Sequence, residues 1–321
     1  MASPARFASR TAPLALSIAL LAPAVLAGCG GGAAPTTADR LTVVAAFYPL
    51  EYAAAQVGGD NVEVVNLTPP GAEPHDLELS PQQVALLGEA DLVVYAAGFQ
   101  PALDEAIAQQ APDRALDVLT GIPDLLEGHS DEHGDEHGDE GAAQPGEAPP
   151  IDPHVWLNPL NMSVIGDEIA SRLSALAPER SGDFASGAQS LASSMDDLNA
   201  EWAAGTAECA NRLLVVSHEA FGYLAQAYDF TQVGIAGLSP EAEPSPARLA
   251  EVVGLVKDQG VTTVYYETLV DPRVAETVAA ETGARTAVLD PLEGLPEGSD
   301  GNYVTVMQEN LAQVREGQGC A

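Results

Sequence analysis

A long stretch without proline, Ser181–Ala207, separates two halves of the sequence that show the same order of strand and helix signals. Apolar residues recur along it at helical steps, at Phe184, Leu191, Met195, Leu198 and Trp202. The pattern predicts one long helix, roughly 40 Å at 1.5 Å per residue, that connects two lobes. The alternative is two shorter helices that are interrupted at Gly187.

Each half alternates short β-branched runs with segments of helical length. The predicted strands of the first half are 41–47, 62–67, 92–95 and 115–118, and its helices are 80–87, 101–110 and 161–176. The predicted strands of the second half are 213–216, 232–235, 261–266 and 286–289, and its helices are 219–227, 245–257, 271–282 and 301–315. This alternation indicates an α/β fold of two (β/α) lobes with mainly parallel sheets. The predicted boundaries are 40–180 for the N-terminal lobe, 181–208 for the connecting helix and 209–321 for the C-terminal lobe.

The charge balance limits the partners that the chain can bind. Its 321 residues include 12 basic and 47 acidic side chains, which give a formal net charge of −35 at pH 7. Such a surface repels nucleic acid and anionic lipid and concentrates cations. The composition therefore argues against a nucleic-acid partner.

The first 28 residues have the features of a secretory signal peptide. Arg6 and Arg10 precede an apolar run, Leu14–Leu26, that is short for a membrane-spanning helix. The sequence LAGC that ends at Cys29 resembles the bacterial lipobox, in which the cysteine is lipidated after cleavage. We therefore expect an extracytoplasmic lipoprotein that Cys29 anchors to the cell membrane, with residues 29–39 as a flexible tether. An ordinary signal peptide with a chance cysteine is the alternative.

The other two cysteines, Cys209 and Cys320, are free to pair in an exported protein. Neither lies in a C-x-x-C motif or at a metal-ligand spacing from a histidine. We interpret the pair as a structural disulfide that ties the start of the second half to the end of the chain.

Residues 128–150 form an acidic insert that contains three of the six histidines, His129, His133 and His137. Glycine, proline and like charges without an apolar pattern are typical of a mobile loop. The three histidines are candidates for an auxiliary metal site, and a solvated charged loop is the alternative.

The remaining histidines, His75, His154 and His218, each have an acidic neighbour, Asp76, Asp152 and Glu219 respectively. His75 and His218 follow predicted strands, as do Glu267 and Asp290. His154 lies in a turn that Pro153 and Pro159 stiffen. Ligands of open parallel sheets bind beyond the carboxyl ends of the strands, so these residues indicate one site in a cleft between the lobes. Three imidazoles and a carboxylate suit zinc, whereas calcium and magnesium prefer more oxygen ligands.

Six segments in this order resemble the solute-binding lipoproteins of zinc and manganese ABC transporters. They are GAEPHDLELSP (71–81), EADLVVYAAG (89–98), DPHVWLNP (152–159), SHEAFGYLA (217–225), EAEPSPARL (241–249) and LDPL (289–292). The resemblance runs from about Leu41 to Asn310 and implies two lobes joined by one rigid helix.

By match to these motifs, the resemblance implies the metal ligands His75, His154, His218 and Asp290. Glu73, Glu267 or water are alternatives for the fourth ligand. Manganese branches of the family tend to carry Glu at the third position, so His218 favours the zinc branch. Zinc members often have an acidic, His-rich insert before the second ligand, and residues 129–140 match it. A weak zinc collector is our hypothesis for that insert.

The function that we expect is capture of zinc and its delivery to an ABC permease by a monomeric binding protein, without catalysis. The alternatives are a manganese carrier of the same family, an anchored zinc-dependent hydrolase, and an adhesin or structural lipoprotein that holds zinc only for stability. No H-E-x-x-H motif is present in support of the hydrolase.

Overall fold

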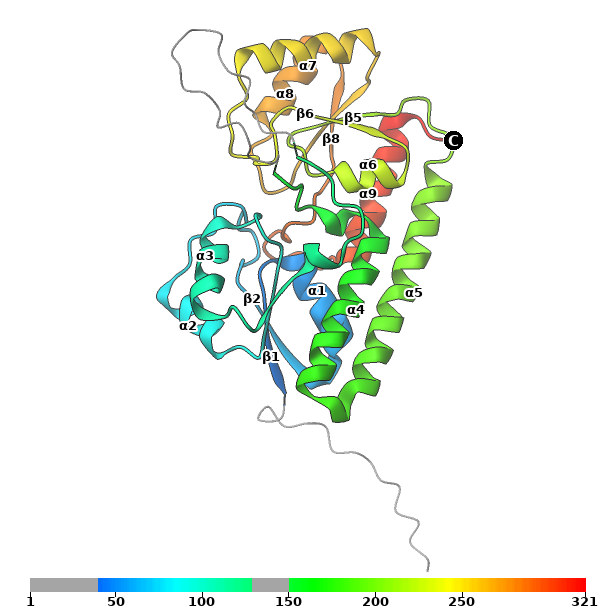
Figure 1. Cartoon of the computed structure of the whole chain (residues 1–321). Helices are drawn as coiled ribbons and strands as arrows, with labels where there is room; N and C mark the ends of the chain where they lie inside the picture. The colour runs from blue at the N-terminus through cyan, green and yellow to red at the C-terminus, as the bar shows by residue number, and fades with distance from the viewer. Residues whose placement is uncertain (1–39, 129–149) are drawn as a thin grey trace, which may run out of the picture. The chain divides into compact units, whose positions relative to one another are not determined.

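The computed structural model describes residues 40–128 and 150–321 (Figure 1). The predicted signal peptide, the tether with Cys29, and His129, His133 and His137 lie outside these residues. Each half of the described chain contains a four-stranded sheet whose strands all pair in parallel. The α/β class with parallel sheets is thus confirmed.

The first sheet has the strand order β2–β1–β3–β4. Its strands are β1 (Leu41–Ala45), β2 (Val62–Asn66), β3 (Leu92–Tyr95) and β4 (Ala115–Asp117), and its helices are α1 (Tyr48–Gly58), α2 (Pro81–Glu89) and α3 (Pro101–Gln110). Strands β1 and β3 are central and almost wholly apolar because both faces of the sheet are covered. The Ser80 side chain starts α2 by accepting from the backbone of Gln83 in a capping box.

Helix α1 was not predicted from the sequence. Its residues continue the apolar run of β1 without an intervening turn signal, and Phe47, the last residue of the predicted strand, is the N-cap of the helix. Pro49 lies in the first turn, where a missing N–H costs nothing. Strand β1 therefore ends at Ala45, two residues earlier than predicted.

Helices α4 (Pro159–Leu176) and α5 (Ser181–Gly205) lie side by side, and α5 also contacts α1 and α9 (Tyr303–Gln318) (Figure 1). Helix α5 continues through Gly187, so the single long connecting helix is confirmed over its interrupted alternative. A β-carbon at Gly187 would lie 2.3 Å from the carbonyl oxygen of Val57. The glycine thus lets the end of α1 approach the backbone of α5.

The second sheet has the strand order β6–β5–β7–β8. Its strands are β5 (Leu213–Val216), β6 (Thr231–Gly234), β7 (Thr263–Tyr266) and β8 (Arg285–Val288), and its other helices are α6 (Gly222–Ala227), α7 (Pro246–Asp258) and α8 (Arg273–Thr282). In both sheets the strand order reverses between the two central strands, β1 and β3 or β5 and β7. Side chains beyond the carboxyl ends of such strands face a natural ligand-binding crevice.

Cys209 and Cys320 form the predicted disulfide, which joins the segment after α5 to the segment after α9. The chain on either side of residues 129–149 is held together by a bridge between Glu127 and Ile151 and by a 2.7 Å hydrogen bond from the N–H of Gly128 to the carbonyl of Pro150. Among residues 40–128 and 150–321, none of the helices combines the length and apolar character that crossing a membrane requires.

Candidate metal centre

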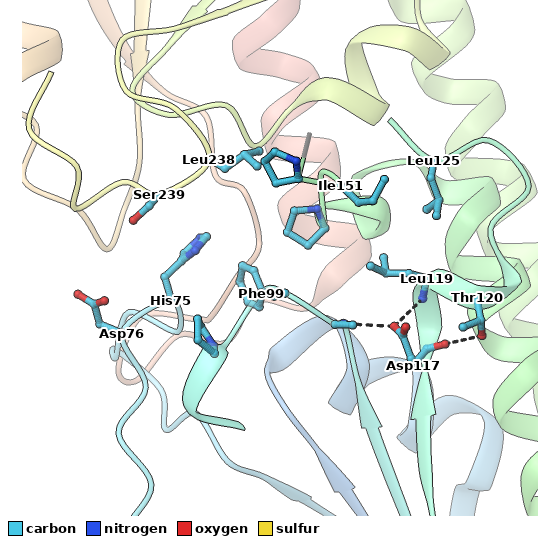
Figure 2. Close-up of a pocket in the computed structure, with 15 residues that line it drawn as sticks. His75, Asp76, Phe99, Asp117, Leu119, Thr120, Leu125, Ile151, Leu238 and Ser239 are labelled. Atoms are coloured by element: carbon cyan, nitrogen blue, oxygen red, sulfur yellow. Dashed lines mark hydrogen bonds between the residues drawn. The ribbon is translucent and has the colours of Figure 1, made fainter. Parts of the chain in front are cut away.

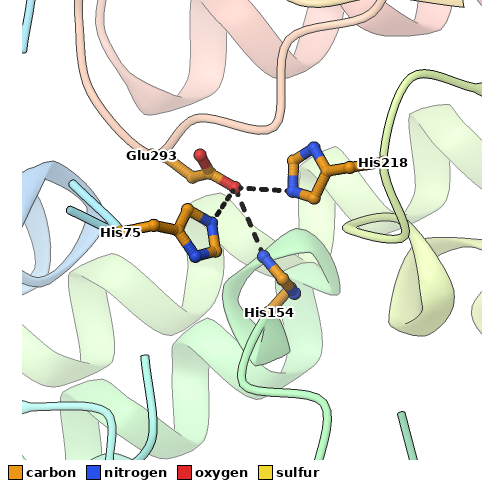
Figure 3. A group of neighbouring side chains, drawn as sticks. All are labelled: His75, His154, His218 and Glu293. Carbon is orange, nitrogen blue, oxygen red and sulfur yellow. Dashed lines mark hydrogen bonds and ion pairs between the residues drawn. The ribbon is translucent and has the colours of Figure 1, made fainter. Parts of the chain in front are cut away.

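Three histidines from distant parts of the chain converge on one carboxylate (Figure 3). His75, His154, His218 and Glu293 each offer one ligand atom, and these four atoms all lie within 4.8 Å of one another. The Nε2 atoms of His75, His154 and His218 lie 3.3, 3.3 and 3.1 Å from Glu293 Oε1. Two members come from the first half of the chain and two from the second, so the group lies where the halves meet.

His154 sits in the turn between the bridge residue Ile151 and α4. Asp152 Oδ1 accepts hydrogen bonds from the backbone N–H of His154 at 2.9 Å and from the ring Nδ1 of His154 at 2.7 Å. Because a carboxylate can only accept, Nδ1 carries a proton and the Nε2 of the neutral ring is left as a lone pair. Tyr223 in α6 donates to the carbonyl of Asp152 at 2.9 Å, which ties this turn to the second half.

His218 follows β5 by two residues, and Glu267 follows β7 directly. Glu267 Oε1 accepts from His218 Nδ1 at 2.6 Å and from the hydroxyl of Ser217. Strands β5 and β7 are the neighbours at the strand-order reversal of the second sheet, which is why these side chains meet. His218 is therefore oriented as His154 is, with Nε2 toward the centre of the group.

His75 lies on the loop between β2 and α2. The backbone N–H of His75 donates to Glu73 Oε1 at 3.1 Å. The ring of His75 packs edge-on against that of Phe99, with the centroids 4.4 Å apart. The side chains of His154 and His218 are fully buried, whereas that of His75 is 10% exposed. His75 is thus the member of the group that solvent reaches.

The charges of the group shift its pKa values in opposite directions. Burial lowers the pKa of His154 and His218, but the carboxylates of Asp152 and Glu267, together with Glu293, outweigh it and raise both values. Burial raises the pKa of Glu293, but the positive charges of His75 and His218 outweigh it and hold that pKa well below its usual value. Without a metal, protons on the imidazoles therefore neutralise a buried carboxylate.

The buried nitrogens fit a divalent cation. Within the described parts of the chain, His154 Nε2 and His218 Nε2 are buried, and their contacts with Glu293 Oε1 at 3.3 and 3.1 Å do not have hydrogen-bond geometry. A poorly satisfied buried polar atom costs free energy, and a metal ion between the imidazoles would remove that cost. Three imidazole nitrogens and one carboxylate oxygen match the donor types and the number that zinc takes in tetrahedral sites.

Comparison with known proteins shows the family to which the chain belongs. The family model described as ZnuA, zinc-uptake complex component A, periplasmic, matches residues 43–317. The chain belongs to the ZnuA family. This confirms the resemblance that the sequence motifs indicated.

The chain is 34% identical to the zinc-binding lipoprotein AdcA of Streptococcus pneumoniae over 280 residues, which are 86% of this chain and 56% of that protein. It is 33% identical to the high-affinity zinc uptake system protein ZnuA of Bacillus subtilis over 303 residues, 91% of this chain and 93% of that protein. The crystal structure of the Zn(II)-bound ZnuA-like domain of pneumococcal AdcA superposes with a TM-score of 0.69 at 32% identity, over 87% of this chain and 99% of that one.

The carboxylate in this ZnuA-family group is Glu293, which the sequence analysis did not consider. Asp290, the expected fourth ligand, lies outside the group, and its carboxylate accepts from Thr268 Oγ1 and from the N–H of Leu292, both at 2.8 Å. Burial raises the pKa of Asp290 to about 6. Glu267, an alternative ligand, instead orients His218. The sequence could have indicated Glu293 as a candidate, because it lies on the same loop beyond β8, only a few residues after Asp290.

A cavity of about 670 Å³ lies beside the group (Figure 2). His75 is the one member of the group that lines it, together with apolar side chains such as Phe99 and Leu238. Asp76 also lines the cavity, and carboxylate oxygens of Asp76, Glu73 and Glu241 lie within 4.8 Å of one another. Glu73, which the sequence analysis gave as an alternative to Asp290, is not in the group with the histidines, and burial raises its pKa. The approach to His75 is therefore acidic.

Proposed function

We propose that this chain is the extracytoplasmic zinc-binding component of an ABC metal importer, which captures zinc and delivers it to a membrane permease. The observation that carries the proposal is the convergence of three imidazole Nε2 atoms on Glu293 Oε1 in a buried group built from both halves of the chain. The ligands in this proposal are His75, His154, His218 and Glu293.

The residues of the group suit reversible capture. A cation attracted by Glu73, Asp76 and Glu241 would reach His75 first, because that side chain lines the cavity. Binding displaces protons from the imidazoles, while Asp152 and Glu267 keep the Nδ1 atoms of His154 and His218 protonated and the rings oriented. The ion then bridges the two halves, so release to the permease requires that they separate.

The donor set supports zinc over manganese and binding over hydrolysis. Manganese prefers more oxygen ligands than the single carboxylate of this group supplies. A catalytic zinc site keeps one coordination position open for water, whereas Glu293 fills the fourth position here. The names of relatives such as the high-affinity zinc uptake system protein of Bacillus subtilis also support zinc uptake by this chain.

We also infer from the LAGC sequence that a lipid on Cys29 anchors the mature chain, which we take to be a monomer. Mass spectrometry of the membrane-bound protein would test the anchor by locating a lipid on an N-terminal Cys29.

Metal analysis of the natively purified protein, with His154→Ala as the comparison, tests the central proposal. We expect about one zinc ion per wild-type chain and none retained by the variant. Growth of a deletion strain in limiting zinc separates an importer from a protein that holds zinc for its own stability. Normal zinc uptake by the deletion strain, or equal zinc content in His154→Ala, would contradict the proposal.

A further inference from the structure

The backbone just before Glu293 has a conformation that L-amino acids rarely adopt. Leu292 has a φ of 58°, one of two non-glycine residues with positive φ in the described chain. Its side chain is fully buried. A leucine in the left-handed region is unfavourable, so its surroundings must hold it there. The bend lies immediately before Glu293, the carboxylate of the group.

Asp290 supplies the contacts that hold the bend. Its Oδ1 accepts from the N–H of Leu292 at 2.8 Å, and its Oδ2 accepts from Thr268 Oγ1 at 2.8 Å. Its own backbone is clamped by Asn310 in α9, which accepts from the Asp290 N–H at 2.8 Å and donates to the Asp290 carbonyl at 2.7 Å. Asp290 therefore links the segment after β7, helix α9 and the residue before Glu293.

The same loop is joined to the turn that carries His154. Trp156 Nε1 donates to the carbonyl of Pro291 at 2.8 Å, and Tyr303 donates its hydroxyl to the carbonyl of Trp156 at 2.5 Å. Both side chains that make these contacts are fully buried. The loop that carries Glu293 is thus tied to the turn that carries His154 by the hydrogen bond between Trp156 and Pro291.

We propose that Asp290 is a positioning residue that presets the carboxylate of Glu293 for a four-coordinate cation and thereby contributes to metal selectivity. This inference rests on the proposed function. A donor group held in place before the ion arrives favours the ion whose geometry it matches. Loss of the bend would free Glu293 and let the site accommodate ions that need more ligands, such as manganese.

The test compares Asp290→Asn with Asp290→Ala. The asparagine keeps an oxygen that can accept from the N–H of Leu292, whereas alanine removes both acceptors. Zinc affinity is measured by chelator competition, the ratio of zinc to manganese affinity by competition between the two ions, and site geometry by the visible spectrum of the Co²⁺-loaded protein. Melting temperatures confirm that each variant folds.

We expect Asp290→Asn to stay within about threefold of the wild-type zinc affinity and to keep the Co²⁺ spectrum, and Asp290→Ala to lose about tenfold or more. Asp290→Ala should also change the Co²⁺ spectrum and reduce the preference for zinc over manganese. Equal losses in the two variants, which a direct ligand would produce, would overturn the proposal. An unchanged spectrum and affinity in Asp290→Ala would overturn it as well.

If Asp290→Ala does not fold, Thr268→Val provides the second test because it removes only the hydroxyl that donates to Asp290. It should shift the Co²⁺ spectrum, whereas the control Thr277→Val, on the exposed face of α8, should not. Identical spectra for the two threonine variants would count against the positioning role. His154→Ala separates the two proposals, since zinc binding by that variant would refute the proposed function itself.

Discussion

The carboxylate of Asp152 packs so closely against the backbone of Gly222 that a β-carbon at position 222 would lie 2.7 Å from Asp152 Oδ2. Asp152 orients His154 through its other oxygen, Oδ1, and Gly222 is the first residue of α6 in the second half of the chain. The absence of a side chain at Gly222 in one half thus leaves room for the carboxylate that orients His154 in the other.

Gly222→Ala should therefore weaken zinc binding. The added methyl group displaces Asp152, and loss of a carboxylate that orients a metal-binding histidine typically costs roughly 10–100-fold in affinity. Chelator competition measures the change. The matched control is Gly254→Ala in α7, where a β-carbon meets nothing within 4 Å and the helix gains about 1 kcal/mol. Equal zinc affinities for the two variants would contradict the role of Gly222.

Glu293→Gln should lower zinc affinity by at least about tenfold, or 1.4 kcal/mol. The substitution keeps the shape of the side chain but removes the negative charge that all three imidazoles face. It should also lower the pKa of His218, because the charge of Glu293 raises that value in the wild type. Isothermal titration and NMR titration of the histidines measure the two effects. Glu297→Gln, an exposed carboxylate on the same loop, is the control and should change neither.

Zinc binding should weaken as the pH falls. The pKa values of His154 and His218 are raised above the ordinary 6.5, so these groups stabilise the metal-free protein fully below 6.5 and lose that contribution as the pH rises through their folded-state values. Zinc binds only neutral imidazoles, so zinc binding is favoured as the pH rises. The lowered pKa of Glu293 keeps it ionised, and its contribution is lost only as the pH falls below the usual 4.5.

The rise in melting temperature on adding zinc should consequently shrink between about pH 8 and about pH 5.5. Differential scanning fluorimetry with and without zinc at each pH measures it. A constant rise across this range would exclude histidine ligation.

The disulfide should stabilise the fold without affecting the metal group. Cys209 and Cys320 are 111 residues apart, and replacing both with serine should cost about 2–4 kcal/mol in the free energy of unfolding. Neither cysteine belongs to the group around Glu293, so zinc affinity should remain unchanged. Urea unfolding and chelator competition measure the two quantities. A reducing agent should destabilise the wild type but not the double variant, which serves as the control.

The sequence by itself determined the two parallel sheets, the long helix α5 and the three histidines of the group. Strand and helix signals repeat over a few residues because each element is built from local periodicity and burial. His75 and His218 could be found because parallel strands bring their carboxyl ends to one edge. His154 was recognisable from its prolines and Asp152, which are close in sequence.

Only the tertiary structure decided that Glu293, and not Asp290, faces the imidazoles. The choice depends on the left-handed bend at Leu292 and on the clamp from Asn310, which lies 20 residues from Asp290. Helix α1 was missed for a related reason, since its apolar residues continue those of β1 and the division between them is set by packing. Local pattern specifies the type of each element, but the distance between two side chains depends on every element that separates them.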